Sequence, residues 1–427
     1  MITTINNKHN KLNFSNEREQ SQACLNSAEH EKNQGRKVLN VPNLRFKEFQ
    51  GEWTTSLLSD YLTENKERNK KGEFDKTDVL SVSGDYGIVN QIELLGRSFA
   101  GASVLPYHVV RHGNIVYTKS PLKEYPYGIV KANTGVDGIV STLYAVYNIK
   151  NNVDAQFIEY YFSSANRTNR YFKPIVRIGA KHDMKIGNQE VLANKVTFPN
   201  LEEQTKIASL FRFLDERIAT QNKIIEDLKK LKSAIIEIEY TPNTKTTSPI
   251  GDVIEQISKR NKNNAIQNVL SVSNRQGFIK QSDQFENRNV ASEDTSNYKI
   301  VEQNDFAFNP ARINVGSIAR LTTFEKGIVS PMYICFRTQE NVAPEYIDYF
   351  FESKHFYCEI QKRLEGSVRQ CLSFEGLCNI PLSLPSFEMQ QLIGKRLFTL
   401  GQKVKTETYL LELLNKQKQY LLRQMFI

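Results

Sequence analysis

The sequence predicts an α+β fold: two mixed α/β domains joined by two long antiparallel coiled-coil helices, with an internal pseudo-two-fold repeat. Two observations predict this fold class. A long segment with helical spacing of its apolar residues occurs twice, once in the middle of the chain and once at its end. The region before each segment shows the same order of strand-like runs, loops and a short helix, which indicates an internal repeat.

The first long helix is predicted over Leu201–Tyr240, a stretch without proline or glycine. Its apolar residues follow the alternating three- and four-residue spacing of a coiled-coil seam, at Ile207, Phe211, Leu214, Ile218, Ile225, Leu228 and Ile235. The same spacing returns 186 positions later, at Ile393, Leu397, Leu400, Val404, Leu411, Leu414 and Leu421. A second long helix is therefore predicted at the end of the chain.

Polar residues interrupt both seams at matching positions, since Gln221 corresponds to Glu407 and Lys232 to Lys418. Charge favours antiparallel pairing, because that direction brings acidic residues beside basic ones at both ends of the pair. It places Glu202 and Glu203 beside Lys416, Lys418 and Arg423, and Glu237 and Glu239 beside Lys395 and Arg396. Antiparallel pairing would also bring Gln221 close to Glu407, and this contact would fix the register of the two helices.

The elements of the first half are expected in this order: an apolar anchor (Val41–Trp53), strands (Val79–Ser83, Asn114–Tyr117, Gly138–Ser141, Leu143–Tyr147), a helix (Asp154–Ser164) and a basic loop (Arg177–Lys185). The second half repeats the order, and Val269–Ser273 matches Val79–Ser83 letter for letter. The chain is therefore divided into a disordered N-terminal arm (1–40), a first domain (41–198), a first long helix (199–240), a linker (241–249), a second domain (250–385) and a second long helix (386–427).

Composition indicates a globular cytoplasmic protein. Hydrophobic residues make up 40% of the chain and charged residues 24%, and no apolar run is long enough to span a membrane. The five cysteines are an odd number without a CxxC pair, which is typical of reduced thiols. A net charge of +9 is compatible with a polyanionic partner.

The sequence contains no motif typical of catalysis. It has no GxxxxGK[ST] phosphate loop, no HExxH and no cysteine–histidine cluster, so we expect no catalytic, cofactor-binding or metal-binding residues in this chain. Asn309-Pro310 is interpreted as a turn, because the residues that follow do not continue the Asn-Pro-Pro-aromatic signature of amino-methyltransferases. Two alternatives remain open from the residues alone: a stand-alone DNA methyltransferase or nuclease, and a coiled-coil adaptor that binds only proteins.

Several segments resemble the DNA-specificity (S) subunits of type I restriction–modification systems. They are LRFKEFQGEW at the start of the first domain, LEEQTKI and DERIATQNKIIEDLKKLK in the first helix, and LPSFEMQQLIGKRL and LLRQMFI in the second. The resemblance covers Val41 to Ile427 and leaves out the N-terminal arm. Met389 departs from the pattern, because the matching position of the first helix carries the acidic Glu203.

The resemblance implies two target-recognition domains that each read one half of a split DNA site, with the long helices as spacers. It implies a non-catalytic subunit whose partners are double-stranded DNA, two modification (methyltransferase) subunits and, through the complex, restriction (translocase–nuclease) subunits. The assembled complex would be an adenine methyltransferase and ATP-dependent endonuclease. S-adenosylmethionine, ATP and Mg would then be held by the partner subunits.

DNA contacts are expected in loops that occupy the same place in both halves but differ in sequence. Arginine, lysine, asparagine, glutamine and tyrosine can bind phosphates or base edges. The candidate DNA-binding residues are Lys119, Lys123, Tyr125, Tyr127, Arg177, Lys181 and His182 in the first half, and Arg275, Arg312, Asn314, Arg369 and Gln370 in the second.

Overall fold

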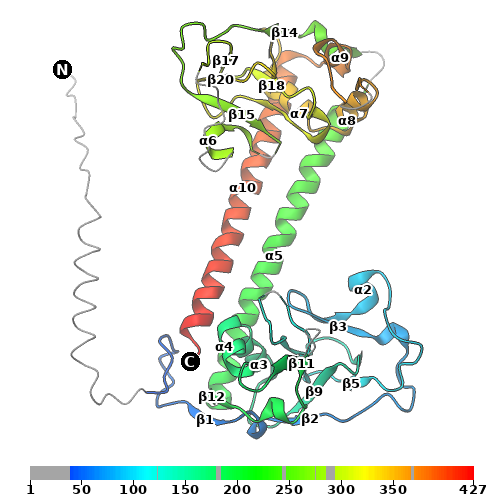
Figure 1. Ribbon diagram of the computed structural model, residues 1–427, viewed down its shortest axis with the longest axis vertical. Coiled ribbons are helices and arrows are strands. Elements are labelled where there is room, and N and C mark those ends of the chain that lie inside the picture. The colour runs from blue at the N-terminus through cyan, green and yellow to red at the C-terminus, as the bar shows by residue number, and fades with distance from the viewer. Residues whose placement is uncertain are drawn as a thin grey trace, which may run out of the picture. The chain divides into compact units, whose positions relative to one another are not determined.

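A computed structural model of the chain describes residues 39–122, 124–178, 184–242, 247–274, 276–284, 294–366 and 370–427. The chain forms two compact units (Figure 1): a first unit, Met1–Asp215 with Lys416–Ile427, and a second unit, Glu216–Asn415. The predicted N-terminal arm, 1–40, lies almost entirely outside the described residues. The predicted domain boundaries remain predictions.

The first unit contains a four-stranded antiparallel sheet of order β2-β9-β6-β7 and the two-stranded sheets β1-β12, β3-β4, β5-β8 and β10-β11. Its strands are β1 (Thr54–Leu57), β2 (Leu62–Glu64), β3 (Leu80–Ser83), β4 (Gly87–Asn90), β5 (His108–Val110), β6 (Ile115–Thr118), β7 (Val130–Ala132), β8 (Gly138–Val140), β9 (Tyr144–Ile149), β10 (Arg177–Ile178), β11 (Met184–Lys185) and β12 (Lys195–Phe198). Its short helices are α2 (Gln91–Leu95), α3 (Ala155–Phe162) and α4 (Ala165–Phe172).

Apolar residues of the strands and helices form the core of the first unit. Every residue of β6 is buried, as expected of the inner strand of a covered sheet. Helix α3 begins where the Asp154 carboxylate accepts a hydrogen bond from the Phe157 backbone N–H, and five of its eight residues are buried. The aromatic rings of Phe157 and Phe198 pack edge to face, with centroids 5.1 Å apart.

The second unit contains two four-stranded sheets, of order β14-β21-β18-β19 and β16-β15-β20-β17, and the pair β13-β22. Its strands are β13 (Thr247–Pro249), β14 (Ile254–Ile257), β15 (Val269–Ser273), β16 (Gly277–Lys280), β17 (Lys299–Glu302), β18 (Phe306–Phe308), β19 (Ile318–Arg320), β20 (Lys326–Val329), β21 (Ile334–Thr338) and β22 (Pro381–Ser383). Its short helices are α6 (Gln281–Gln284), α7 (Pro344–Phe350), α8 (Lys354–Gln361) and α9 (Phe374–Cys378).

Strands that correspond in the sequence also pair in the same way in both units. The sheet β2-β9-β6-β7 of the first unit has the succession of β14-β21-β18-β19 in the second. In the second unit β15 joins β20 in parallel, with Val269 opposite Ile328. A single parallel bridge between Val79 and Ile139 occupies the same place in the first unit.

The two long helices are α5 (Leu201–Glu239) and α10 (Phe387–Gln424), and each contributes to both units. In the first unit the start of α5 packs against the end of the chain, and the rings of Phe211 and Phe426 lie 5.8 Å apart. In the second unit the end of α5 shares a core with the start of α10, through Ile236 and Leu397. Within each unit the two helices therefore run in opposite directions.

The predicted contact between Gln221 and Glu407 is confirmed. The Gln221 amide Nε2 donates to the Glu407 carboxylate over 2.6 Å and to the Glu407 backbone carbonyl over 3.1 Å, and both side chains are buried. This is a polar contact inside an otherwise apolar helix pair, and such contacts fix register.

The predicted pairing of Glu203 with Lys418 is wrong. Glu203 is buried and forms a salt bridge of 2.7 Å with Arg45 of the N-terminal anchor, while Lys418 pairs with Asp215. The reason is that the anchor segment covers the start of α5. Glu48 of the anchor also pairs with Lys206 of α5, and the Leu44 backbone N–H donates to the carbonyl of Gln424 at the end of α10 over 2.9 Å.

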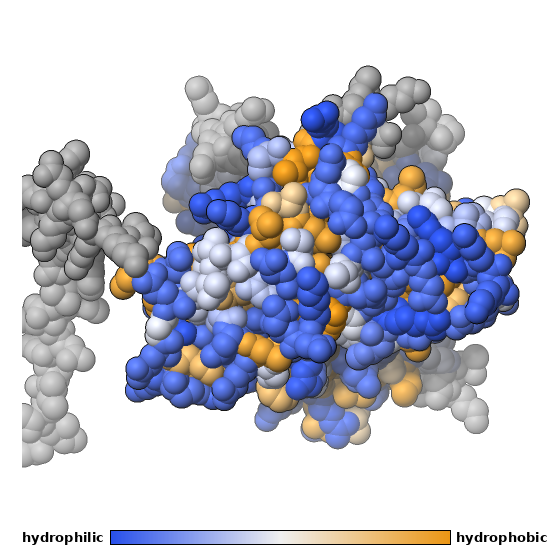
Figure 2. Space-filling model, turned by 90° about the horizontal axis from the view of Figure 1, so that it is seen from below, coloured by the Kyte–Doolittle hydropathy of each residue, from blue (hydrophilic) through white to orange (hydrophobic). Residues whose placement is uncertain are grey.

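Among the described residues, no helix combines the length and apolar character needed to cross a bilayer. Hydrophilic residues cover most of the face shown in Figure 2, and the hydrophobic residues on it form separate small patches. Such a face is typical of a surface in contact with water.

Candidate nucleic-acid interface

Five of the predicted DNA-binding residues cannot be placed. Lys123, Lys181, His182, Arg275 and Arg369 lie outside the described residues. The other seven belong to the loop between β6 and β7, to β10, to the loop between β18 and β19, and to the segment before α9.

In the first unit, two predicted side chains already have partners within the protein. Lys119 Nζ donates to Asn188 Oδ1 over 2.5 Å, and Asn188 in turn donates to Glu64 over 2.8 Å. Burial lowers the pKa of Lys119. The Tyr125 hydroxyl donates to the Ser163 carbonyl over 2.5 Å, and burial raises the pKa of Tyr125. Both residues contribute to the internal structure of the loop, and their role toward DNA remains a prediction.

The other two residues of the first unit differ in exposure. Tyr127 is half-buried against the core, and its backbone carbonyl accepts a hydrogen bond of 2.6 Å from the Tyr117 hydroxyl. The next residue, Gly128, has φ +85°, and a Cβ there would lie 2.0 Å from the Thr118 carbonyl oxygen, so only glycine fits this turn. Arg177 is exposed on β10.

In the second unit, the loop between β18 and β19 contains Arg312 and Asn314. It forms the 3-10 turn η5 (Ile313–Val315), which ends at Gly316 with φ +86°. Arg312 is exposed immediately before this turn, and Asn314 within it is half-exposed. Gln370 is exposed in another part of this unit.

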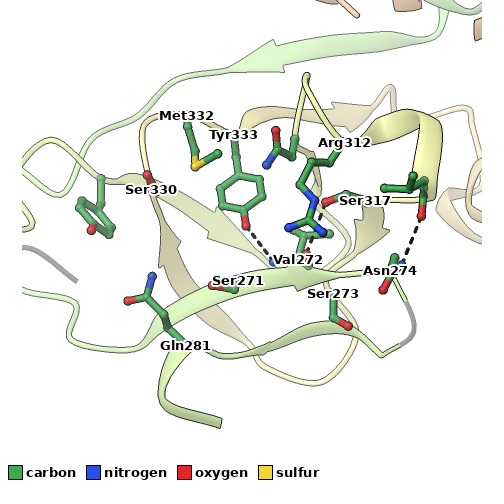
Figure 3. Close-up of a pocket in the computed structure, with 13 residues that line it drawn as sticks. Ser271, Val272, Ser273, Asn274, Gln281, Arg312, Ser317, Ser330, Met332 and Tyr333 are labelled. Carbon is green, nitrogen blue, oxygen red and sulfur yellow. Dashed lines mark hydrogen bonds between the residues drawn. The ribbon is translucent and has the colours of Figure 1, made fainter. Parts of the chain in front are cut away.

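Arg312 borders a cavity of about 290 Å³ in the second unit (Figure 3). The cavity is lined by Ser271, Val272, Ser273, Asn274, Gln281, Tyr298, Asn309, Arg312, Val315, Ser317, Ser330, Met332 and Tyr333. Arg312 is the only charged residue in this lining. Figure 3 shows its guanidinium directed toward Val272 and Ser317.

The predicted site residues do not include the polar neighbours of Arg312 in this cavity. Asn274, Asn309 and Gln281 all contribute to its lining. A usable signal was present in the sequence: Gln281 follows the second copy of the identical strand at the position that Gln91 holds after the first. A polar residue that recurs at the same distance from a repeated strand indicates that this part of the two units has the same structure.

The first unit also contains a buried histidine outside the predicted DNA-binding residues. His108 is only 2% exposed on β5, and its Nδ1 has no hydrogen-bond partner among the described residues. Burial lowers the pKa of His108 to about 4, and the positive charge of Arg68 contributes in the same direction.

The predicted seam residues differ in burial. Those that are fully buried are Ile207, Phe211, Leu214, Ile225, Ile393, Leu397 and Leu414. Those that are half-buried are Ile218, Leu228, Leu400, Val404 and Leu411. The described residues contain no group of three or more histidine, cysteine, aspartate or glutamate side chains placed to hold a metal ion.

The second half of the chain matches a known family. Residues 242–416 match the family model described as "Type I restriction modification DNA specificity domain". This part of the chain, and not its first half, is thus similar to a type I DNA-specificity domain. The matched region includes Arg312, Asn314 and Gln370.

Solved structures are similar to the chain along most of its length. The S subunit of a type I restriction–modification system from M. genitalium is 14% identical, with a TM-score of 0.53 over 91% of this chain and 99% of that one. The HsdS subunit from Thermoanaerobacter tengcongensis is 14% identical, with a TM-score of 0.44 over 88% of this chain and 96% of that one. The first of these similarities supports a common mixed α/β fold. No curated protein sequence matches the chain.

Proposed function

We propose that this chain reads a split DNA site, with one target-recognition domain for each half, as the non-catalytic subunit of a type I restriction–modification complex. The observation that carries the proposal is the common strand succession of the two units, of which the second contains the matched specificity domain. A recognition fold that occurs twice with different loops suits two unequal half-sites.

In this proposal the domains have the bounds predicted from the sequence. Residues 41–198 and 250–385 are the target-recognition domains, 199–240 and 386–427 are antiparallel coiled-coil spacers, and 241–249 links the two copies of an internal pseudo-two-fold repeat. The buried Gln221–Glu407 contact supports a fixed register for the spacers. A fixed register would hold the gap between the half-sites constant.

The DNA-contacting residues in the proposal are those of the diverging loops. Arg177, Arg312, Asn314 and Gln370 are accessible on the described surface and suit this role best. Lys119 and Tyr125 first have to break an internal hydrogen bond to reach DNA.

We further propose that helix α10 provides a docking surface for a methyltransferase subunit. Phe387, Phe398, Tyr409 and Leu413 are exposed apolar residues of the second unit, and we call them the α10 stripe. Spacings of 11, 11 and 4 residues place them on one face of a helix, opposite the seam residues. Exposed aromatic side chains in a row are typical of protein interfaces. S-adenosylmethionine, ATP and Mg are proposed to bind to the partner subunits, and this chain to bind none of them.

A methylome tests the proposal. The chain is expressed with its cognate modification subunit in a host free of DNA methylation, and modified bases are read genome-wide. We expect two short defined sequences separated by a fixed undefined gap. Replacing residues 41–198 by the corresponding domain of another specificity subunit should change one half only. Methylation at a continuous motif would contradict the two-domain assignment.

A further inference from the structure

The cavity beside Arg312 has an unbalanced charge. Among the described residues, its lining contains one guanidinium and no carboxylate, and the rest is formed by hydroxyl, amide, phenol and apolar groups. The guanidinium of Arg312 has no hydrogen-bond or ion-pair partner among the described residues. Elsewhere in this unit a guanidinium is neutralised internally, since Arg320 bonds Glu345 over 2.7 Å. A cavity with a positive charge and neutral donors suits an anion.

The backbone holds Arg312 in place before any ligand arrives. Its N–H donates to the Asn309 carbonyl over 3.0 Å, and its own carbonyl accepts from Val315 over 3.2 Å and from Ser317 over 3.1 Å. Gly316 closes the turn with φ +86°. Because the loop is already ordered, an anion bound here would not have to pay for ordering it.

Two buried hydroxyls face the same cavity. Ser271 and Ser317 are 3% and 5% exposed, and both contribute to the lining. The Asn274 amide is held at the rim by a hydrogen bond of 3.4 Å to the Val315 carbonyl. Hydroxyl and amide groups are common ligands of DNA phosphates, together with arginine.

The strand wall of the cavity repeats in the first unit, although the loop that carries Arg312 does not, and the repeat favours a sequence-independent role for this wall. The identical strand and the residues beside it supply the same side chains in both units, with Ser271, Ser273, Gln281 and Ser330 corresponding to Ser81, Ser83, Gln91 and Ser141. Residues that read bases should differ between unequal half-sites, whereas residues that bind the common backbone need not.

The concave shape of the cavity also favours a phosphate over a base edge as the group that binds there. Phosphates protrude from the surface of a duplex, whereas base edges are recessed in the grooves. A concave cavity can surround a protruding group but cannot reach into a groove.

We infer that the Arg312 cavity binds a phosphate of the DNA backbone and so sets the position of the second domain on its half-site without reading sequence. The inference rests on the proposed function and specifies which part of the DNA this site binds.

The test measures DNA binding by the full chain in complex with its modification subunits. One duplex carries the site defined by the methylome, and a second has the half-site of the second domain scrambled. Affinity is measured from low to moderate salt for the wild type, Arg312→Gln, Arg312→Lys and the control Lys354→Gln. Lys354 is an exposed cation of α8 in the same unit and does not line the cavity.

We expect Arg312→Gln to weaken binding to both duplexes by the same factor, on the order of tenfold. It should also reduce the slope of log affinity against log salt by about 0.9, the value for one phosphate contact. Arg312→Lys should restore much of the affinity, and Lys354→Gln should bind as the wild type does.

Other outcomes would overturn the inference. A loss confined to the intact site would show that Arg312 reads a base, and an Arg312→Gln complex equal to the control would show no contact. Inorganic phosphate is added at constant ionic strength as a further probe. If it binds the wild type but Arg312→Gln leaves DNA binding unchanged, the cavity takes free phosphate instead. If the wild type itself binds the two duplexes equally well, the proposed function fails. This outcome concerns the wild type alone, so it can be told apart from a failure of the inference about Arg312.

Discussion

At the scale of single residues, His108 links the stability of the first unit to pH. The folded protein holds this side chain neutral because burial lowers its pKa to about 4, whereas an unfolded chain takes up the proton near pH 6.5. The unfolded state therefore binds more protons between these two values. The contribution of the neutral His108 to the stability of the folded state is therefore complete above about pH 6.5, and it decreases as the pH falls toward 4.

We expect His108→Gln to remove this part of the pH dependence. The difference between wild type and variant in the free energy of unfolding should change by at most about 3 kcal/mol between pH 7 and pH 4. Denaturant titrations across this range provide the measurement, and His112→Gln, at an exposed histidine four positions away, is the matched control. Parallel pH profiles for wild type and His108→Gln would contradict the prediction.

At the scale of elements, α10 combines two faces with different tasks. Its seam face contributes Ile393, Leu397 and Leu414 to the buried parts of the protein. Its opposite face exposes the α10 stripe, where Phe398 is 53% and Tyr409 61% exposed. Exposure of large aromatic residues in water is unfavourable, and a partner that covers them would recover this free energy.

We expect the double substitution Phe398→Ser with Tyr409→Ser to weaken association with the modification subunit at least about tenfold, because aromatic anchors dominate interface energies. Size-exclusion chromatography with light scattering, and a titration of the two purified proteins, would measure it. The control is Leu392→Ser, an exposed apolar position of the same helix outside the stripe. Equal association of the double variant and the control would place the docking surface elsewhere.

Periodicity and repetition were sufficient to predict the long helix α5 and the contact of Gln221 with Glu407. Individual polar partners could not be predicted in this way. Lys119 bonds Asn188, which is 69 residues away in the sequence, and Arg45 bonds Glu203 across 158 residues. Such pairs depend on how separate loops fold over one another, and local sequence carries no signal of that.

At the scale of the whole molecule, the first unit is discontinuous in the sequence. Its core contains Leu422, Met425 and Phe426 from the end of the chain, packed with Phe157 and Phe211. The second unit consists of one continuous segment, Glu216–Asn415. The end of the chain is therefore a structural part of the first unit.

We expect a chain that stops after Asn415 to lose the folded first unit and to keep the second. Removing a buried side chain of this size costs about 2–5 kcal/mol, and three such losses are comparable to the stability of a whole domain. Calorimetry should then show one unfolding transition where the full chain shows two. Deleting only Ile427, which is exposed, serves as the control. A truncated chain that retains both transitions would show that the C-terminal segment is dispensable.

The discontinuity of the first unit has a consequence for the order in which the protein matures on the ribosome. Domains generally fold in the order of their synthesis, with the N-terminal one first. Here the part that is translated first cannot complete its core until Leu422, Met425 and Phe426 have left the ribosome. Synthesis of the first unit thus begins before that of the second and ends after it, and a nascent chain that has not reached Phe426 leaves this apolar core open. Quality-control factors that bind exposed apolar segments can therefore distinguish a finished chain from an unfinished one.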